Sequence, residues 1–313
     1  MTPTKMKTVR LGTRGSELAL RQADLVAGAL QKAAPDIEVQ CRVIRTRGDA
    51  VLDTALSLIG DKGLFTAELE AQLLDGSIDI AVHSLKDMPT ELAEGLCIGA
   101  VLKREDPRDA LLSPAGHVFE ALPGGAVLGT SSLRRAAQIQ WKRPDIRIVP
   151  LRGNVGTRIR KMHEQQLDGI VLAYAGLRRL GLEHLIADVL PPETIMPAAG
   201  QGAIAVETRA ADSPAAAILA GLDDAVTRLE TRAERAFLQT LHGGCQVPIA
   251  CTAVMRGERM TVRGLVALPD GSTVYASEIR GDAGEALSLG RDLARRLLGR
   301  GARKIIEAIS PPG

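Results

Sequence analysis

An alternation of short, strand-like apolar runs with helical patterns fills the first two thirds of the chain and constrains its fold more than any other feature. Residues 8–12 predict a strand, and Ser16 has the position of an N-cap for a helix that runs to about Lys32. The same pattern predicts strands at 38–46, 78–83, 96–102, 126–129, 146–151, 169–173 and 203–207, with helices at 65–74, from Ser132 and from Val155. Such alternation indicates an α/β chain with mostly parallel sheets.

The last third of the chain has a different pattern. A helix is predicted at 222–241, and the glycine pair that follows it would end that helix. Strands at 249–255, 260–268 and 272–279 and a helix at 285–300 come next. We interpret this part as a separate α+β domain, because 313 residues exceed what one hydrophobic core usually holds.

Composition limits the class of protein. Hydrophobic residues make up 45% and charged residues 24%, which is ordinary for a globular protein. No apolar stretch reaches the length of a membrane span, and residues 1–10 lack the apolar segment of a secretion signal. We therefore expect a cytoplasmic protein that does not associate with a membrane.

The four cysteines are too few for a disulfide scaffold in a chain of this length. Cys41 and Cys97 lie in strand-like apolar runs, where we expect small buried thiols. Cys245 and Cys251 have no histidine at the spacing of a zinc site, so we expect no metal.

Positive charge is concentrated in one segment. Between Thr130 and Lys161 nine basic residues stand against Asp145 alone, although the whole chain carries a net charge of only +2. A solvated basic face is the commoner meaning of such a run. The alternative is a site for an anionic ligand, because the planar guanidinium of arginine pairs with carboxylates through two hydrogen bonds.

Unusual polar residues follow four of the predicted strands at their carboxyl ends, which is where open α/β sheets bind ligands. They are Arg14 and Ser16; Ser84, Lys86 and Asp87; Thr130, Ser131, Ser132 and Arg134; and Arg152, Gly153, Asn154 and Arg158. The same loops are expected to open helices, whose first N–H groups favour anions. Helix capping explains part of the serine and threonine content, but four such loops together favour a cleft for a polyanion.

Asp87 is an acid among these bases. It could form an ordinary surface pair with Lys86, which would contribute little. It could instead stabilise a cation that develops during a reaction, or transfer a proton. We expect His83, one step inside the strand, to be a core residue rather than a catalyst.

Cys245 stands in the loop His242-Gly-Gly-Cys-Gln-Val-Pro248, directly after the long predicted helix. Glycines allow close backbone approach there, so this thiol is expected to be accessible. A half-buried cysteine at a helix end is the structural alternative to a covalent role.

Eight motifs occur in a fixed order, and together they resemble those of the porphobilinogen deaminase family. They are TRGSELA at 13–19, GLF at 63–65, HSLKDMP at 83–89, REDPRD at 104–109, GTSSLRR at 129–135, LRGNVGTR at 151–158, GQG at 200–202 and GGCQVP at 243–248. The resemblance extends from about residue 9 to residue 308. One departure is His242, where many members of the family have glutamate.

The resemblance implies two lobes like those of periplasmic binding proteins, between which the chain crosses twice, and a C-terminal α+β domain. The implied boundaries are 1–102 with 203–221 for the first lobe, 103–202 for the second, and 222–313 for the C-terminal domain. It also implies a transferase, hydroxymethylbilane synthase, which acts in the porphyrin, haem and tetrapyrrole pathway. Four porphobilinogens would be joined head to tail, each losing ammonia, on one dipyrromethane cofactor per chain held by a thioether to Cys245.

By match to the motifs, Asp87 becomes the catalytic carboxylate that assists loss of the amino group and stabilises the resulting cation. Residues implied to bind the cofactor are Cys245, Ser84, Lys86, Thr130, Ser132, Arg134, Arg135 and Arg158. Those implied to bind substrate carboxylates are Arg14, Ser16, Arg152, Arg158 and Arg179. Lys62 and Phe65 would belong to a mobile loop over the cleft. We expect a monomer whose partners are porphobilinogen and the growing oligopyrrole.

Two rival functions remain. A two-lobed anion-binding protein would need no catalysis, but it would also need neither a covalent anchor at Cys245 nor the acid at Asp87. A protein that binds single-stranded nucleic acid normally interleaves aromatic with basic residues. Trp141 is the one aromatic residue between Thr130 and Lys161, so we expect no nucleic-acid partner.

Overall fold

The computed structural model describes residues 7–50, 65–210, 214–241 and 247–309. These residues form two compact units. The first comprises the described residues up to 105 together with 202–228, and the second comprises 106–201 together with the described residues after 228.

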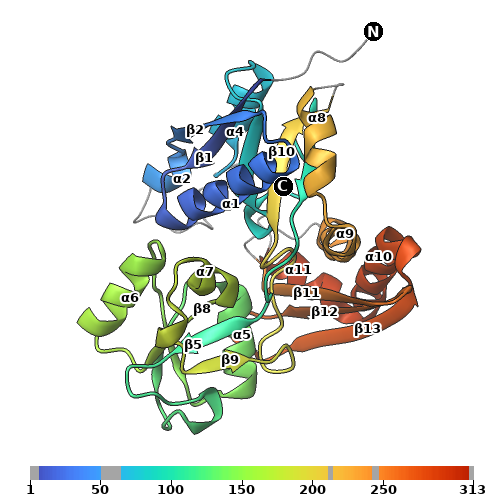
Figure 1. Cartoon of the computed structure of the whole chain (residues 1–313). Coiled ribbons are helices and arrows are strands. Elements are labelled where there is room, and N and C mark those ends of the chain that lie inside the picture. Colours follow the sequence, from blue (N-terminus) through green and yellow to red (C-terminus); the bar gives the residue numbers. More distant parts are fainter. Residues whose placement is uncertain (1–6, 51–64, 211–213, 242–246, 310–313) are drawn as a thin grey trace. The chain divides into compact units, whose positions relative to one another are not determined.

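The described part of the first unit holds a five-stranded sheet in the order β2-β1-β3-β10-β4 (Figure 1). Its strands are β1 (Thr8–Arg14), β2 (Glu38–Ile44), β3 (Ile80–Ser84), β4 (Leu96–Val101) and β10 (Ile204–Arg209). Its helices are α1 (Glu17–Ala33), α2 (Arg47–Ala50), α4 (Ala67–Leu74) and α8 (Pro214–Leu219), with 3₁₀ turns η1 (Leu85–Asp87) and η4 (Ala220–Leu222). Helices α1 and α8 pack on one face of the sheet, and α4 packs on the other.

The second unit holds another five-stranded sheet within its described residues, in the order β7-β6-β8-β5-β9. Its strands are β5 (Asp109–Leu112), β6 (Val127–Gly129), β7 (Arg147–Val149), β8 (Gly169–Ala173) and β9 (Asp188–Leu190). Its helices are α5 (Leu133–Lys142), α6 (Val155–Glu164) and α7 (Tyr174–Arg179), with 3₁₀ turns η2 (Phe119–Ala121) and η3 (Glu183–Leu185). Helix α5 covers one face of this sheet through Ile139, and α6 and α7 cover the other through Met162 and Leu177.

The second unit also contains a three-stranded antiparallel sheet in the order β11-β12-β13. Its strands are β11 (Ile249–Arg256), β12 (Arg259–Ala267) and β13 (Val274–Asp282). The helical elements near it are α9 (Ala225–Thr240), η5 (Ala283–Glu285), α10 (Ala286–Leu297), the π-helical turn η6 (Leu298–Ala302) and α11 (Arg303–Ile309). Phe237, Val262 and Leu293 centre its core, and Gly290 lets α10 approach α9 so closely that a Cβ would collide with the Ala233 carbonyl.

The predicted fold class is confirmed: two α/β sheets are followed by an antiparallel sheet with helices. The N-cap prediction is also confirmed, since Ser16 Oγ accepts a hydrogen bond from the N–H of Ala19 at 3.3 Å. Chain order agrees with two crossings, because the chain passes from β4 to β5 of the other sheet and returns from β9 to β10.

The prediction of mostly parallel sheets was wrong. In the first sheet β1 runs parallel to β2 and β3, but β10 is antiparallel to both β3 and β4. In the second, β6 is parallel to β7 and β8, whereas β5 is antiparallel to β8 and β9. The antiparallel strands β10 and β5 each follow a crossing of the chain rather than a crossover helix of a βαβ unit, which would impose parallel pairing. Strands β5 and β9 were not predicted.

The prediction of a buried thiol at Cys41 was also wrong. Strand β2 lies at the edge of its sheet, Cys41 is exposed and Val43 is 58% exposed. Alternation along β2 puts Val39, Cys41 and Val43 on one face, but an edge strand buries such a face only where another element covers it. Cys97 is partly buried, and Cys251 is buried.

Candidate active site

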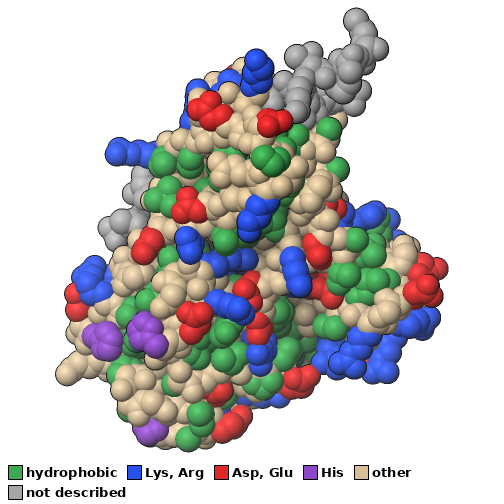
Figure 2. Space-filling view, viewed as in Figure 1, with side chains coloured by type: hydrophobic (Ala, Val, Ile, Leu, Met, Phe, Trp, Pro, Cys, Tyr) green, Lys and Arg blue, Asp and Glu red, His purple; other side chains and the backbone are tan. Residues whose placement is uncertain are grey.

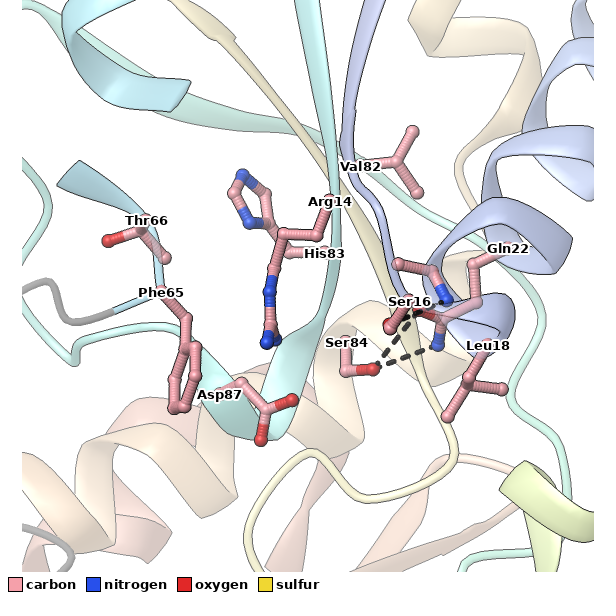
Figure 3. A pocket seen from close by; sticks show the side chains of 11 residues that line it. Arg14, Ser16, Leu18, Gln22, Phe65, Thr66, Val82, His83, Ser84 and Asp87 are labelled. Carbon is pink, nitrogen blue, oxygen red and sulfur yellow. Dashed lines mark hydrogen bonds between the residues drawn. The ribbon is translucent and has the colours of Figure 1, made fainter. Parts of the chain in front are cut away.

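A pocket lies in the first unit beside the carboxyl ends of β1 and β3 (Figure 3). Its lining includes Arg14, Ser16, Leu18, Ala19, Gln22, Phe65, Thr66, Val82, His83, Ser84 and Asp87. Six of these residues (Arg14, Ser16, Phe65, His83, Ser84 and Asp87) were singled out from the sequence, and the structure brings them together around one pocket.

Asp87 ends the short turn η1, directly after the buried strand β3. Its side chain is exposed, whereas Leu85 and Met88 on either side anchor the turn in the core. The turn therefore holds an accessible carboxylate on a rigid support, as a catalytic acid requires. Lys86 belongs to the same turn and is partly buried.

Arg14 is the last residue of β1, and its guanidinium carbon lies 4.1 Å from the centroid of the Phe65 ring. This distance is that of a cation–π contact. Figure 3 shows the two side chains on the same side of the pocket as Asp87. The pocket therefore combines a cation, a carboxylate and an aromatic face.

Gln22 was missed by the sequence reasoning. It is 3% exposed on α1, its Nε2 donates to Ser84 Oγ at 2.9 Å, and Ser84 Oγ lies 3.2 Å from Gln22 Oε1. The signal was available, because Ala19, Ala23 and Val26 mark the buried stripe of α1 and Gln22 falls within it. A polar residue in an apolar stripe requires a partner, and here the partner is a residue implied to bind the cofactor.

The second unit gathers a separate group of predicted residues at the start of α5. Thr130 Oγ1 accepts from the N–H of Ser132 at 3.2 Å, and Ser132 Oγ accepts from the N–H of Arg135 at 3.4 Å as the N-cap of α5. A hydroxyl that accepts an N–H bond keeps its own proton to donate. Capping is thus compatible with the binding of an anion.

Arg134 and Arg135 are buried and both pair with Asp109, a residue that the sequence reasoning did not single out. Arg134 Nη1 lies 2.7 Å from Asp109 Oδ2, and Arg135 Nη2 lies 2.7 Å from Oδ1. Gln201 Nε2 adds a hydrogen bond of 2.9 Å to Oδ1. Although burial acts to raise it, the two guanidiniums hold the pKa of Asp109 well below its usual range. Two cations and one anion leave this buried cluster with a net charge of +1.

Arg152 and Arg158 flank the N-terminus of α6, which Asn154 caps by accepting from the N–H of Thr157 at 2.8 Å. Arg158 Nε donates to the Gly153 carbonyl at 2.7 Å, and both arginines are partly buried. Arg179 ends α7, directly after β8, and is also partly buried.

Three of the remaining basic residues of the segment 130–161 have nearby partners. Arg143 pairs with Asp145 at 2.7 Å, Arg160 pairs with Glu164 at 2.6 Å, and Lys142 lies over the Trp141 ring. The run is therefore a mixture of structural pairs, solvated charges and residues at helix starts. Figure 2 shows another concentration of basic side chains over β13, where Arg280 pairs with Glu278 on the surface.

Two predicted site residues, Lys62 and Cys245, lie outside the described residues. None of the helices in the described ranges combines the length and apolar character that crossing a bilayer requires.

Comparison with protein families gives two matches that together cover most of the chain. The model described as "Porphobilinogen deaminase, dipyromethane cofactor binding domain" matches residues 9–217, and "Porphobilinogen deaminase, C-terminal domain" matches residues 228–299.

Curated proteins match over nearly the full length. Porphobilinogen deaminase of Syntrophomonas wolfei is 53% identical over 301 residues, which are 96% of this chain and 98% of that protein. That of Carboxydothermus hydrogenoformans is 50% identical over 303 residues, 97% of each chain, and that of Pelotomaculum thermopropionicum is 49% identical over 301 residues, 96% of each.

Among solved structures, the VFT2 domain of Bordetella pertussis BvgS matches with a TM-score of 0.42 and 14% identity, covering 69% of this chain and 86% of that one. Two family models and full-length relatives at about half identity settle the classification. The chain belongs to the porphobilinogen deaminase family.

Proposed function

We propose that this chain is a hydroxymethylbilane synthase that joins four porphobilinogens head to tail and releases one ammonia for each. Membership of the family makes it an enzyme of tetrapyrrole biosynthesis. The observation that carries the proposal is the pocket in which the Asp87 carboxylate, the Arg14 guanidinium and the Phe65 ring come together. A pyrrole with two carboxylate side chains requires a cation, a hydrogen-bond acceptor for its ring N–H and an apolar face.

Asp87 would act on the aminomethyl group of porphobilinogen. When the C–N bond breaks, the nitrogen leaves as ammonia and positive charge develops on the methylene carbon and the pyrrole ring. A carboxylate that accepts a hydrogen bond from the ring N–H stabilises that charge where it forms. The α-carbon that then attacks must lose its proton, and the carboxylate oxygens of Asp87 can accept it.

The dipyrromethane cofactor fits the residues of the second unit. The buried cluster of Asp109, Arg134 and Arg135 carries a net charge of +1, and such a charge is costly unless an anion balances it. A carboxylate of the cofactor would supply that anion. Thr130 and Ser132 at the start of α5 would donate hydroxyl hydrogen bonds to it, and Arg158 would bind a further carboxylate.

When bound, the cofactor supplies the pyrrole α-carbon at which the first new bond forms. Cys245 would hold it through a thioether, so the growing oligomer stays on the enzyme. Ser84, fixed by Gln22, and Lys86 would also bind the cofactor, while Arg14, Ser16, Arg152, Arg158 and Arg179 would bind substrate carboxylates. Lys62 and Phe65 would belong to the loop over the cleft.

We also propose the division into a first lobe (1–102 and 203–221), a second lobe (103–202) and a C-terminal domain (222–313). The enzyme is proposed to be a cytoplasmic monomer, and light scattering of the purified chain at assay concentration would detect any larger assembly.

The mass of the purified chain tests this function. The intact, denatured protein should exceed its sequence mass by two linked pyrrole units, and digestion should place that mass on the peptide with Cys245. Limiting porphobilinogen should then give species one pyrrole apart, with ammonia released in step. Cys245→Ser should lack the added mass and all turnover, while Cys41→Ala, the control, should keep both. A turning-over protein whose Cys245 can be alkylated would contradict the proposal.

A further inference from the structure

A second carboxylate lies behind the pocket, in a position that the proposed reaction does not use. Glu207 lies on β10, opposite Ala81 of the antiparallel strand β3. Because side chains on a strand alternate between the two faces, Glu207 and His83 share a face and lie diagonally across the strand pair. His83 Nε2 is 3.1 Å from Glu207 Oε2.

Both side chains are buried. The exposed fraction is 4% for His83 and 0% for Glu207, on the face of the sheet where Leu69 and Leu73 of α4 pack against Ala81. The approach of Nε2 to the carboxylate is not aligned as a hydrogen bond. Neither Glu207 oxygen accepts a hydrogen bond from any residue in the described ranges.

Burying an ionised carboxylate without a hydrogen-bond donor is strongly unfavourable in free energy. Such a group is stable when it carries a proton itself or lies beside a protonated, positively charged group. That proton is either on Glu207 itself or on the imidazole that faces it. The two residues together therefore retain one proton inside the first unit.

The position of His83 gives this proton a function. The imidazole lines the same pocket as Arg14 and Asp87, whereas Glu207 does not reach it. Figure 3 shows the ring beside the Arg14 side chain. A pair with the proton on His83 and the negative charge on Glu207 therefore has its positive end at the pocket wall and its negative end away from it.

We propose that Glu207 is a positioning residue for His83, and that the pair presents a protonated imidazole to the pocket as a second cationic group, beside Arg14, for a substrate carboxylate. This rests on the proposed function, since it assigns a substrate group to the pocket of Asp87. It revises the expectation that His83 is only a core residue. The pair acts on binding rather than on C–N cleavage, so its loss should raise KM and leave kcat nearly unchanged.

Proton NMR of the cofactor-loaded wild-type protein tests the proton directly. An imidazole N–H that faces a buried carboxylate should give a downfield resonance in slow exchange with water. The resonance should be absent from His83→Gln and Glu207→Gln and present in His163→Gln, whose histidine is exposed on α6. A wild-type spectrum without this resonance overturns the proposal. This measurement does not depend on turnover. An inactive wild-type protein that shows the resonance would therefore contradict the proposed function but not the presence of the proton in the pair.

Steady-state kinetics test the effect on substrate. Both Glu207→Gln and His83→Gln should lose a charged hydrogen bond to the substrate carboxylate. We expect KM to rise roughly tenfold in each variant, with kcat within about threefold of wild type. Glu38→Gln, at an exposed position on β2, should match wild type. Rates are to be normalised to the cofactor-loaded fraction measured by mass. If both variants retain the wild-type KM and lose only stability or loading, the pair is structural and the proposal fails; if one variant does not fold, the other decides.

Discussion

The guanidinium of Arg14 lies over the ring of Phe65, 4.1 Å from its centroid, at the pocket that also contains Asp87. The contact joins residues 51 positions apart in the sequence, and it holds the guanidinium against the aromatic ring. An arginine held in this way loses less conformational freedom when it binds a carboxylate.

Phe65→Leu should therefore weaken substrate binding. The change keeps apolar volume but removes the ring face, and a cation–π contact contributes about 0.5–2 kcal/mol. We expect KM to rise by roughly two- to thirtyfold, with the larger effect if the contact is desolvated. Trp141→Leu removes a similar contact with Lys142 on the surface of α5 and should leave KM unchanged. Equal KM values for both variants and wild type would argue against a role for the ring.

Asp87→Asn should retain the shape of the side chain and lose its charge. One preorganised electrostatic group contributes roughly 10²–10³ in turnover, so we expect kcat to fall at least that far while mass spectrometry still finds the cofactor attached. Asp75→Asn, at an exposed position after α4, serves as the control and should turn over like wild type. Turnover near wild type for folded, loaded Asp87→Asn would remove Asp87 from the mechanism.

Arg158→Leu should impair cofactor assembly or the first additions of substrate, because a carboxylate loses a charged partner worth about 1.5–3 kcal/mol. Arg160→Leu is the matched control, since Arg160 lies on the same helix but pairs with Glu164 on the surface. The measurement is the fraction of chains with added mass, followed by single-turnover addition of porphobilinogen. Similar loading and addition in both variants would make Arg158 another solvated charge.

Asp109→Asn should destabilise the second unit, because it leaves two buried guanidiniums without their anion. Breaking a buried pair costs about 3–5 kcal/mol, to be measured by urea unfolding at neutral pH. Asp106→Asn breaks the more exposed pair with Arg108 and should cost about 0–1 kcal/mol. Similar losses of unfolding free energy in both variants would show that burial does not make the Asp109 pairs more important than the Asp106 pair.

The contribution of the Asp109 carboxylate to the free energy of unfolding should depend on pH in a definite direction. The pKa of Asp109 is lower in the folded chain than in the unfolded chain. Its stabilisation is therefore fully present above the ordinary aspartate value of about 4 and is lost as pH falls below that value. The difference in unfolding free energy between wild type and Asp109→Asn should accordingly stay constant from pH 7 to about 5 and shrink in more acidic solution. A difference that grows on acidification would contradict this assignment.

Local sequence determined many of the helices and strands of this protein, although not β5 or β9. Ser16 begins α1 because a serine before an amphipathic run can cap the first free N–H groups, and that signal is contained within four residues. Residues 169–173 form β8 as predicted, because a short apolar run bounded by turns is typical of a strand buried inside a sheet. Asp87 was likewise recognisable as an acid at the end of a buried strand.

Only the tertiary structure decided which polar groups meet. His83 and Glu207 are 124 positions apart, and Asp109 meets Arg134 from a strand that periodicity did not reveal. The direction of two strands was also decided by the tertiary structure. Strands β5 and β10 pair antiparallel with their neighbours because the chain reaches each of them from a strand of the other sheet. Local propensity carries no information on such pairings. A buried charged group must have a partner of opposite charge or a hydrogen-bond partner, because burying it alone is unfavourable. The completed fold decides which residue lies close enough to be that partner.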